Sequence, residues 1–159
     1  MSCFRIFGEL KLNRMTKRIN IYKVSPEAYA PMIALEKYIA SSGLDIILYE
    51  LIKTRASQIN GCAYCLNMHT RDAMKEGETA QRLFLLNAWR ETELFTEKER
   101  AVLALTEEMT LIANNHVSDE VYSEAAKYCS EKELAAVMMA IVVINGWNRM
   151  AIATELELD

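Results

Sequence analysis

The sequence predicts an all-α protein: a single helical domain of about six or seven helices. The 159 residues include only 5 Gly and 2 Pro and are rich in Ala, Leu, Ile, Met, Glu and Lys, a composition that favours helices over turns. Helix-start signals recur along the chain, while no segment shows the apolar–polar alternation of a strand. A chain of this length forms one domain with a substantial core.

The first two helices are predicted for residues 26–40 and 44–59. Ser25 precedes Pro26, which is the pattern of an N-cap followed by proline at the first helical position. A Ser-Ser-Gly sequence ends this helix. The second helix carries apolar residues at helical spacing: Leu44, Ile47, Leu48, Leu51 and Ile52.

A third helix is predicted for residues 62–76, after the break at Asn60-Gly61 and with Gly77 as its C-terminal cap. A short helix at residues 79–87 follows. The remaining helices are predicted from their capping residues and run to about residues 113, 128 and 155. Their starts are Thr96 with Glu99, Ser118, and Ser130 with Glu133.

The domain is expected to occupy residues 22–159, after an N-terminal tail at residues 1–21. The tail is basic but lacks the continuous apolar segment and cleavage site of a secretory signal. Met15 is a plausible true start, which would make the first fourteen residues a start-site artefact. The four cysteines are too few and too uneven for a disulfide-stapled secreted scaffold, so a cytoplasmic location is expected.

Charge and hydropathy exclude two classes of partner. The net charge is −4 and no basic stripe is interleaved with aromatic residues, so no nucleic acid partner is expected. No apolar run reaches the roughly 18 residues that a membrane span needs. The apolar stretch at residues 135–144 is shorter and is interpreted as a buried helix.

The candidate active site consists of Glu50, Cys62, Cys65 and His69. Cys62 and Cys65 stand at i and i+3, and His69 lies four residues further, so one face of a helix carries all three. An imidazole one turn from a thiol can take its proton, and a helix start lowers a thiol pKa. Glu50 reaches His69 if the two helices form a hairpin over the Asn60-Gly61 turn, and can then hold the imidazole or relay its proton.

The cysteine pair has three other interpretations. A thioredoxin-type motif requires a preceding β-strand, whereas the residues before Cys62 are predicted helix and turn. A zinc site would need four ligands, drawn from Cys62, Cys65, His69 and either Glu50 or His116. The cysteines could also be buried apolar residues. A thiol-based redox site fits the pattern best.

Three stretches of this chain resemble the alkylhydroperoxidase D (AhpD-like) family, within the carboxymuconolactone decarboxylase superfamily. The similarity covers residues 22–154, and the cysteine motif is its specific part. The stretches are Glu50-X11-Cys62-X2-Cys65-X3-His69, then Trp89-Arg90 with Phe95 to Ala101, and Asn145-Gly146-Trp147-Asn148-Arg149.

The resemblance implies an all-helical, AhpD-like fold and a cofactor-free, thiol-dependent peroxidase acting on organic hydroperoxides in antioxidant defence. In the family the second cysteine attacks the peroxide and the first resolves the sulfenic acid, roles that fall on Cys65 and Cys62. Glu50 and His69 match the proton-relay positions. The implied partners are an external dithiol reductant and further copies of the chain, as a homotrimer or homohexamer. The superfamily's decarboxylases lack the cysteine pair, so lactone decarboxylation is not implied.

The alternative is a non-catalytic oligomeric module that uses the same four residues to bind a transition metal or sense redox state. Under the peroxidase hypothesis, Cys65 is expected to lie deeper than Cys62, because it is one turn inside the helix. Cys62 is expected near an exposed helix start, where it would receive electrons from the reductant. Trp89 and Trp147 are expected in the core or in a subunit interface.

Overall fold

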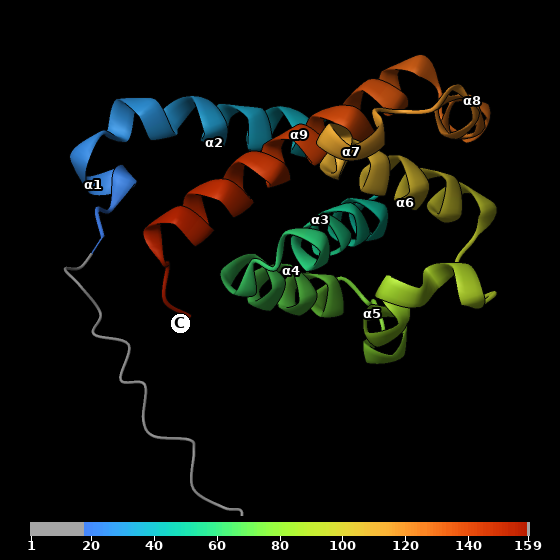
Figure 1. Cartoon of the computed structure of the whole chain (residues 1–159), viewed down its shortest axis with the longest axis horizontal. Helices are drawn as coiled ribbons and strands as arrows, with labels where there is room; N and C mark the ends of the chain where they lie inside the picture. The colour runs from blue at the N-terminus through green and yellow to red at the C-terminus, as the bar shows by residue number, and fades with distance from the viewer. Residues whose placement is uncertain (1–17, 159) are drawn as a thin grey trace, which may run out of the picture.

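The computed structural model describes residues 18–158, and every regular element in this part of the chain is helical (Figure 1). The prediction of a single all-α domain is confirmed. Residues 1–17, which contain Cys3 and most of the predicted tail, lie outside the described residues. The helices are α1 (Ile21–Val24), α2 (Pro26–Ser41), α3 (Ile46–Asn60), α4 (Ala63–Lys75), α5 (Ala80–Leu85), a 3-10 helix (Leu86–Glu91), α6 (Glu97–Thr110), α7 (Ile112–Asn115), α8 (Asp119–Tyr128) and α9 (Glu131–Thr154).

The capping residues place most helix boundaries within two residues of their predicted positions. Thr96 and Glu99 form the predicted capping box at the start of α6, and Ser118 and Ser130 cap α8 and α9. Two four-residue helices, α1 and α7, were not predicted as separate elements. Helices this short contain only about one turn, so they carry no apolar periodicity.

Helix α9 crosses the molecule diagonally (Figure 1) and contributes many side chains to the core. It packs against α2, α3, α6 and α8. It is also the one helix in the described part whose length and composition would suffice for a membrane span, with about half of that stretch buried inside the fold. This matches the expectation of a buried helix at residues 135–144. Its buried apolar side chains include Leu134, Val137, Ile141, Val143 and Ile144.

The Met32 side chain of α2 packs directly over Gly146 of α9. A Cβ atom at this position would lie 2.8 Å from the Met32 Cε atom on α2, closer than carbon atoms approach without a shift. A side chain here would require the flexible end of Met32 to move. One turn further along α2, Glu36 accepts a hydrogen bond from Trp147 of α9.

The hairpin of α3 and α4 turns at Gly61, which adopts a left-handed conformation with φ +68°. Glycine reaches this region without steric cost, which explains its position at the helix C-cap. The Cys62 N–H then donates back to the Ser57 carbonyl at 3.0 Å. The turn therefore fixes Cys62 at the start of α4 and lays α4 alongside α3.

Candidate active site

The two cysteines lie together at the beginning of α4. Cys62 is the N-cap residue, and its Sγ accepts a hydrogen bond from the Cys65 N–H at 3.4 Å. The two Sγ atoms are 2.7 Å apart, so a sulfenic acid formed on one sulfur is within immediate reach of the other. Both side chains are buried, in an apolar cluster with Ala56, Ile144 and Ala151.

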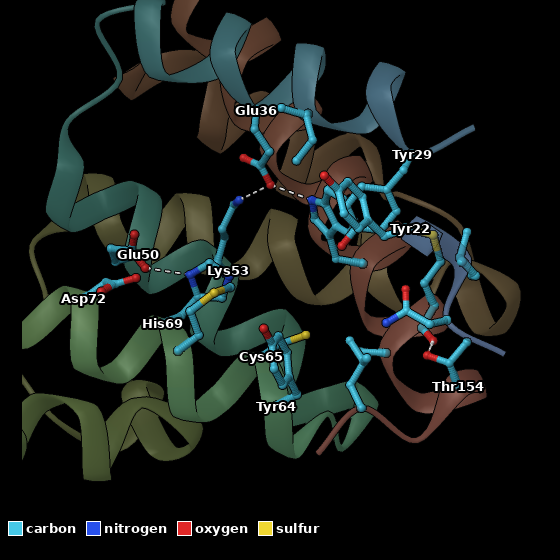
Figure 2. A pocket seen from close by; sticks show the side chains of 18 of the residues that line it. Tyr22, Tyr29, Glu36, Glu50, Lys53, Tyr64, Cys65, His69, Asp72 and Thr154 are labelled. Carbon is cyan, nitrogen blue, oxygen red and sulfur yellow. Dashed lines mark hydrogen bonds and ion pairs between the residues drawn. The ribbon is translucent and has the colours of Figure 1, made fainter. Parts of the chain in front are cut away.

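Glu50 and His69 meet across the α3–α4 hairpin, as its predicted geometry required. The His69 Nδ1 atom lies 2.8 Å from Glu50 Oε2, and both side chains are only 6% exposed (Figure 2). A carboxylate at this nitrogen favours the tautomer with hydrogen on Nδ1. The other ring nitrogen, Nε2, is buried and has no hydrogen-bond partner among the described residues. The imidazole is therefore oriented by Glu50 and free to accept a proton at Nε2.

A cavity of about 590 Å³ gives these groups a common space. Cys65, His69 and Glu50 are among the described residues that line this cavity, whereas Cys62 is not. Aromatic side chains form one wall, where Trp147 and Tyr29 pack edge-on with ring centroids 4.8 Å apart (Figure 2). The cavity thus presents one of the two sulfurs to a ligand, beside an acid–base pair.

The expectation that Cys62 lies near an exposed helix start is wrong. Its exposed fraction is 0%, against 2% for Cys65. Helix starts usually face solvent, but here α9 packs against α4, and Cys62 belongs to a buried apolar cluster that includes Ile144 and Ala151 of α9. This coverage depends on a helix about 80 residues further along the chain, which local sequence does not report.

The pKa of the Cys65 thiol is raised, which is opposite to the effect that a helix start favours. Burial and the hydrogen bond with Cys62 raise the pKa of Cys65 above its ordinary value. Asn148 and the charge of Lys53 act in the opposite direction but do not outweigh burial. Desolvation disfavours a thiolate more strongly here than the partial charge of one helix end favours it. Formation of a thiolate at Cys65 would therefore require neighbouring groups that accept the proton or stabilise the charge.

Sequence reasoning missed a second polar cluster in the cavity, centred on Glu36. Lys53 Nζ lies 2.5 Å from Glu36 Oε1, and Trp147 Nε1 donates to the same oxygen at 2.7 Å (Figure 2). Tyr49 Oη donates to Glu36 Oε2 at 2.6 Å. Lys53 could have been noticed, because it stands three residues after Glu50 on the same face of α3. Glu36 gave no such signal, since its partners come from α3 and α9.

An amide network joins α3 to α9 behind the cysteines. Asn60 Nδ2 donates to the side-chain oxygens of Asn145 and Asn148 at 3.0 and 2.8 Å. Asn148 in turn donates to Ser57 Oγ at 3.0 Å. These residues tie the two helices together.

The residues proposed as zinc ligands do not form a metal centre. Within the described part of the chain, no group of three or more His, Cys, Asp or Glu side chains is arranged to hold a metal ion. His69 uses Nδ1 for Glu50, and His116 lies at the end of α7. The geometry therefore supports thiol chemistry over a structural zinc site.

Comparison with known proteins identifies the family. Residues 26–108 match the carboxymuconolactone decarboxylase family. The protein YdfG of Bacillus subtilis, which is uncharacterized, is 42% identical over 139 residues, covering 87% of this chain and 95% of YdfG. Alkyl hydroperoxide reductase AhpD of Corynebacterium aurimucosum is 39% identical over 46 residues, which cover 29% of this chain and 26% of that protein.

A solved structure agrees with both matches. Protein ATU0492 of Agrobacterium tumefaciens superposes with a TM-score of 0.87 at 39% identity, covering 91% of this chain and 99% of that one. It is described as a protein of unknown function that is a candidate AhpD antioxidant defence protein. The family match, the similarity over nearly the whole of YdfG and the shared fold establish the relationship. The chain belongs to the carboxymuconolactone decarboxylase family, as an AhpD-like member.

Proposed function

We propose that this protein is a thiol-dependent peroxidase that reduces organic hydroperoxides through Cys62 and Cys65. The observation that carries the proposal is the cavity in which Cys65 and a Glu50-oriented His69 face the same space. The second sulfur, 2.7 Å from the first, completes a redox pair. The AhpD relative and the antioxidant-defence description of ATU0492 support the same reaction and a role in antioxidant defence.

The first half of the proposed reaction oxidises Cys65. His69 Nε2 accepts the thiol proton, and Glu50 stabilises the resulting imidazolium through Nδ1–H. The thiolate attacks the terminal oxygen of the hydroperoxide, so that an S–O bond forms as the O–O bond breaks. The departing alkoxide takes the proton back from His69 and leaves as an alcohol. Cys65 is left as a sulfenic acid.

The second half restores the thiols. The Cys62 sulfur attacks the Cys65 sulfur, an S–S bond forms, and the sulfenic oxygen leaves as water. An external dithiol then reduces this disulfide by thiol–disulfide exchange and becomes a disulfide itself. In total, one hydroperoxide and one dithiol yield an alcohol, water and an oxidised dithiol. Each step uses only residues of this chain and the two substrates, so the proposed cycle needs no cofactor.

The cavity walls favour a hydroperoxide with an organic body. Tyr29 contacts both Trp147 and Tyr22 edge-on, with centroid distances of 4.8 and 5.4 Å, so three rings form a continuous surface. Ile33 and Met68 add further apolar lining. Burial of an apolar group against these side chains contributes about 25 cal/mol per Å². Hydrogen peroxide has no such group, so organic hydroperoxides should be preferred.

Assembly as a homotrimer or homohexamer in the cytoplasm is part of the proposal. Large apolar side chains remain exposed on the single chain, including Phe84 at 80% and Val24 at 64%. Apolar surface of this kind commonly marks contacts between subunits. Light scattering of the purified protein tests the point, and a monomer at micromolar concentration would count against it.

Titration of free thiols tests the proposed chemistry. One equivalent of organic hydroperoxide should consume two thiols per wild-type chain, while Cys65→Ser should lose none. Retention of both thiols in the wild type would refute the peroxidase.

Metal content of protein purified under reducing conditions tests the alternative hypothesis. One zinc per chain without peroxide turnover would replace the peroxidase by a metal-binding module.

A further inference from the structure

Lys53 is a buried cation that the proposed reaction leaves without a role. Its side chain is only 2% exposed, and its neighbours on α3 are fully buried residues of the core. Lysine is rarely found in such a place unless it is paired, because removing an ammonium group from water is costly. Lys53 also lines the cavity that holds Cys65. A buried charge kept at a ligand cavity calls for a functional explanation.

The Glu36 carboxylate fixes the position of the Lys53 ammonium group and favours its charged form. Three donors fix the Glu36 carboxylate: Lys53 at 2.5 Å, Tyr49 at 2.6 Å and Trp147 at 2.7 Å. Burial raises the pKa of Glu36, but Lys53 and the other donors outweigh it and the net pKa is lowered. Burial lowers the pKa of Lys53, and Glu36 opposes this effect without outweighing it, so the net pKa of Lys53 is lowered. The pair is therefore anchored on three helices, α2, α3 and α9.

The titratable groups around Lys53 and Cys65 come from four helices. Helix α1 contributes Tyr22, α2 contributes Tyr29 and Glu36, α3 contributes Tyr49 and Glu50, and α4 with its N-cap contributes Cys62, Tyr64, His69 and Asp72. Two of the three carboxylates among them pair with a lysine, Glu36 with Lys53 and Asp72 with Lys75, and Glu50 pairs with His69 Nδ1. The group that acquires negative charge in the proposed reaction is the Cys65 sulfur, and the charge of Lys53 lowers its pKa.

We propose that the Lys53 ammonium, held by Glu36, is the counter-ion of the Cys65 thiolate. The inference rests on the proposed function only in taking Cys65 as the reactive thiol. On ionisation the proton moves from Sγ to His69 Nε2, and the negative charge stays on the sulfur, facing the cavity it shares with Lys53. The two pairs thus have separate roles, since Glu50–His69 takes the proton and Glu36–Lys53 stabilises the charge.

The pH dependence of Cys65 alkylation tests this role directly. Alkylation by iodoacetamide in the Cys62→Ser protein, followed on the Cys65 peptide by mass spectrometry, reports the thiolate. Lys53→Met should move the midpoint of the profile upward by about 1–3 pH units, so that at a fixed lower pH the rate falls by about 10–1000-fold. Lys53→Arg should retain most of the wild-type rate, because it keeps the positive charge.

Lys98→Met is the matched control. Lys98 also lies 2.5 Å from a glutamate, Glu133, but this pair is outside the cavity, so its loss should leave the profile unchanged. Lys53→Met leaves Glu36 buried without its cation and could unfold the protein. The double variant Glu36→Gln/Lys53→Met removes both charges and should fold. It should still show an upward shift, smaller than that of Lys53→Met because the negative charge of Glu36 is removed as well.

An unchanged midpoint in folded Lys53→Met, or in the double variant, would overturn the counter-ion role. This result is distinguishable from failure of the proposed function. Alkylation requires no peroxidase activity, so a shifted midpoint in a protein whose Cys65 resists hydroperoxide would uphold the counter-ion and refute the peroxidase. Hydroperoxide oxidation of Cys65 with no shift in the midpoint would uphold the peroxidase and refute the counter-ion role.

Discussion

Two glutamates, the partly buried Glu107 and the buried Glu50, show how a structural ion pair differs from one that we propose to be reactive. Glu107 on α6 accepts hydrogen bonds from Trp89 Nε1 at 2.9 Å, from Arg55 Nε at 2.8 Å and from Arg90. Glu50 on α3 meets a single ring nitrogen of His69, and the other nitrogen of that ring has no partner among the described residues.

The difference lies in what remains unsatisfied. Around Glu107 the charges and donors are matched and several elements are joined, which is the pattern of a group that stabilises a fold. The Glu50–His69 pair instead leaves one nitrogen, His69 Nε2, without a partner beside the cavity. A buried polar atom without a partner is costly, and an unpartnered nitrogen beside a cavity fits the proposed role of His69 as a base that acquires its partner during the reaction. Four experiments test the contrast, beginning with the largest expected effect.

Replacement of the cysteines should abolish turnover in two distinguishable ways. Cys65→Ser should consume no hydroperoxide, because the cavity-facing nucleophile is lost. Cys62→Ser should react once and stop with a sulfenic acid on Cys65, which mass spectrometry detects. Cys129→Ser, at a buried cysteine of the main core, is the control and should turn over normally. A sulfenic acid on Cys62 in the Cys65→Ser protein would reverse the assigned roles.

Replacement of the open acid–base pair should cost rate and leave the fold intact. We expect His69→Ala and Glu50→Ala to lose about 10²–10⁴ in the rate of Cys65 oxidation, because the general base or its support is removed. Stopped-flow kinetics with organic hydroperoxide measures the loss. Wild-type rates in either variant would show that the unpartnered His69 Nε2 atom does not act as the general base.

Replacement of Glu107 should lower the stability of the fold and leave the reaction rate unchanged. Glu107→Gln should lower the free energy of unfolding by about 2 kcal/mol, because charged hydrogen bonds are lost, while the single-turnover rate stays unchanged. Burial raises the pKa of Glu107 and its donors, Arg90 first, outweigh this, so the folded-state pKa is lowered. The contribution is therefore present above the unfolded-state pKa and is lost as pH falls through the folded-state pKa. Urea unfolding should show the difference between wild type and variant shrinking on acidification.

The smallest effect is expected at Thr54, whose Oγ1 is the other buried side-chain atom without a hydrogen-bond partner in the described part of the chain. Unlike His69 it lies outside the cavity lining. Thr54→Val should therefore raise the free energy of unfolding by about 1 kcal/mol, since an unpartnered hydroxyl is removed at constant shape. Peroxide reactivity should not change. A loss of rate here would extend the reactive region beyond the cavity.

The sequence predicted those features that depend on neighbouring residues. Helix caps such as Thr96 with Glu99 identify their helices because the interaction spans three residues. The contact between Glu50 and His69 followed from one hairpin and its turn. Glu36 and the coverage of Cys62 could not be predicted, because both depend on α2 and α9 packing from distant parts of the chain. Lys53 lay within reach of sequence reasoning, one turn from Glu50 on the same helix face.

The burial of Cys62 has a kinetic consequence for the proposed reaction. Once the disulfide has formed, the sulfur that borders the cavity is that of Cys65. An incoming thiolate must therefore attack Cys65 through the opening that admitted the peroxide, and Cys62 departs as the leaving group. Oxidant and reductant then use the same entrance in alternation. Steady-state rates should follow a ping-pong pattern in which each substrate, at high concentration, competes with the other for the wrong form of the enzyme.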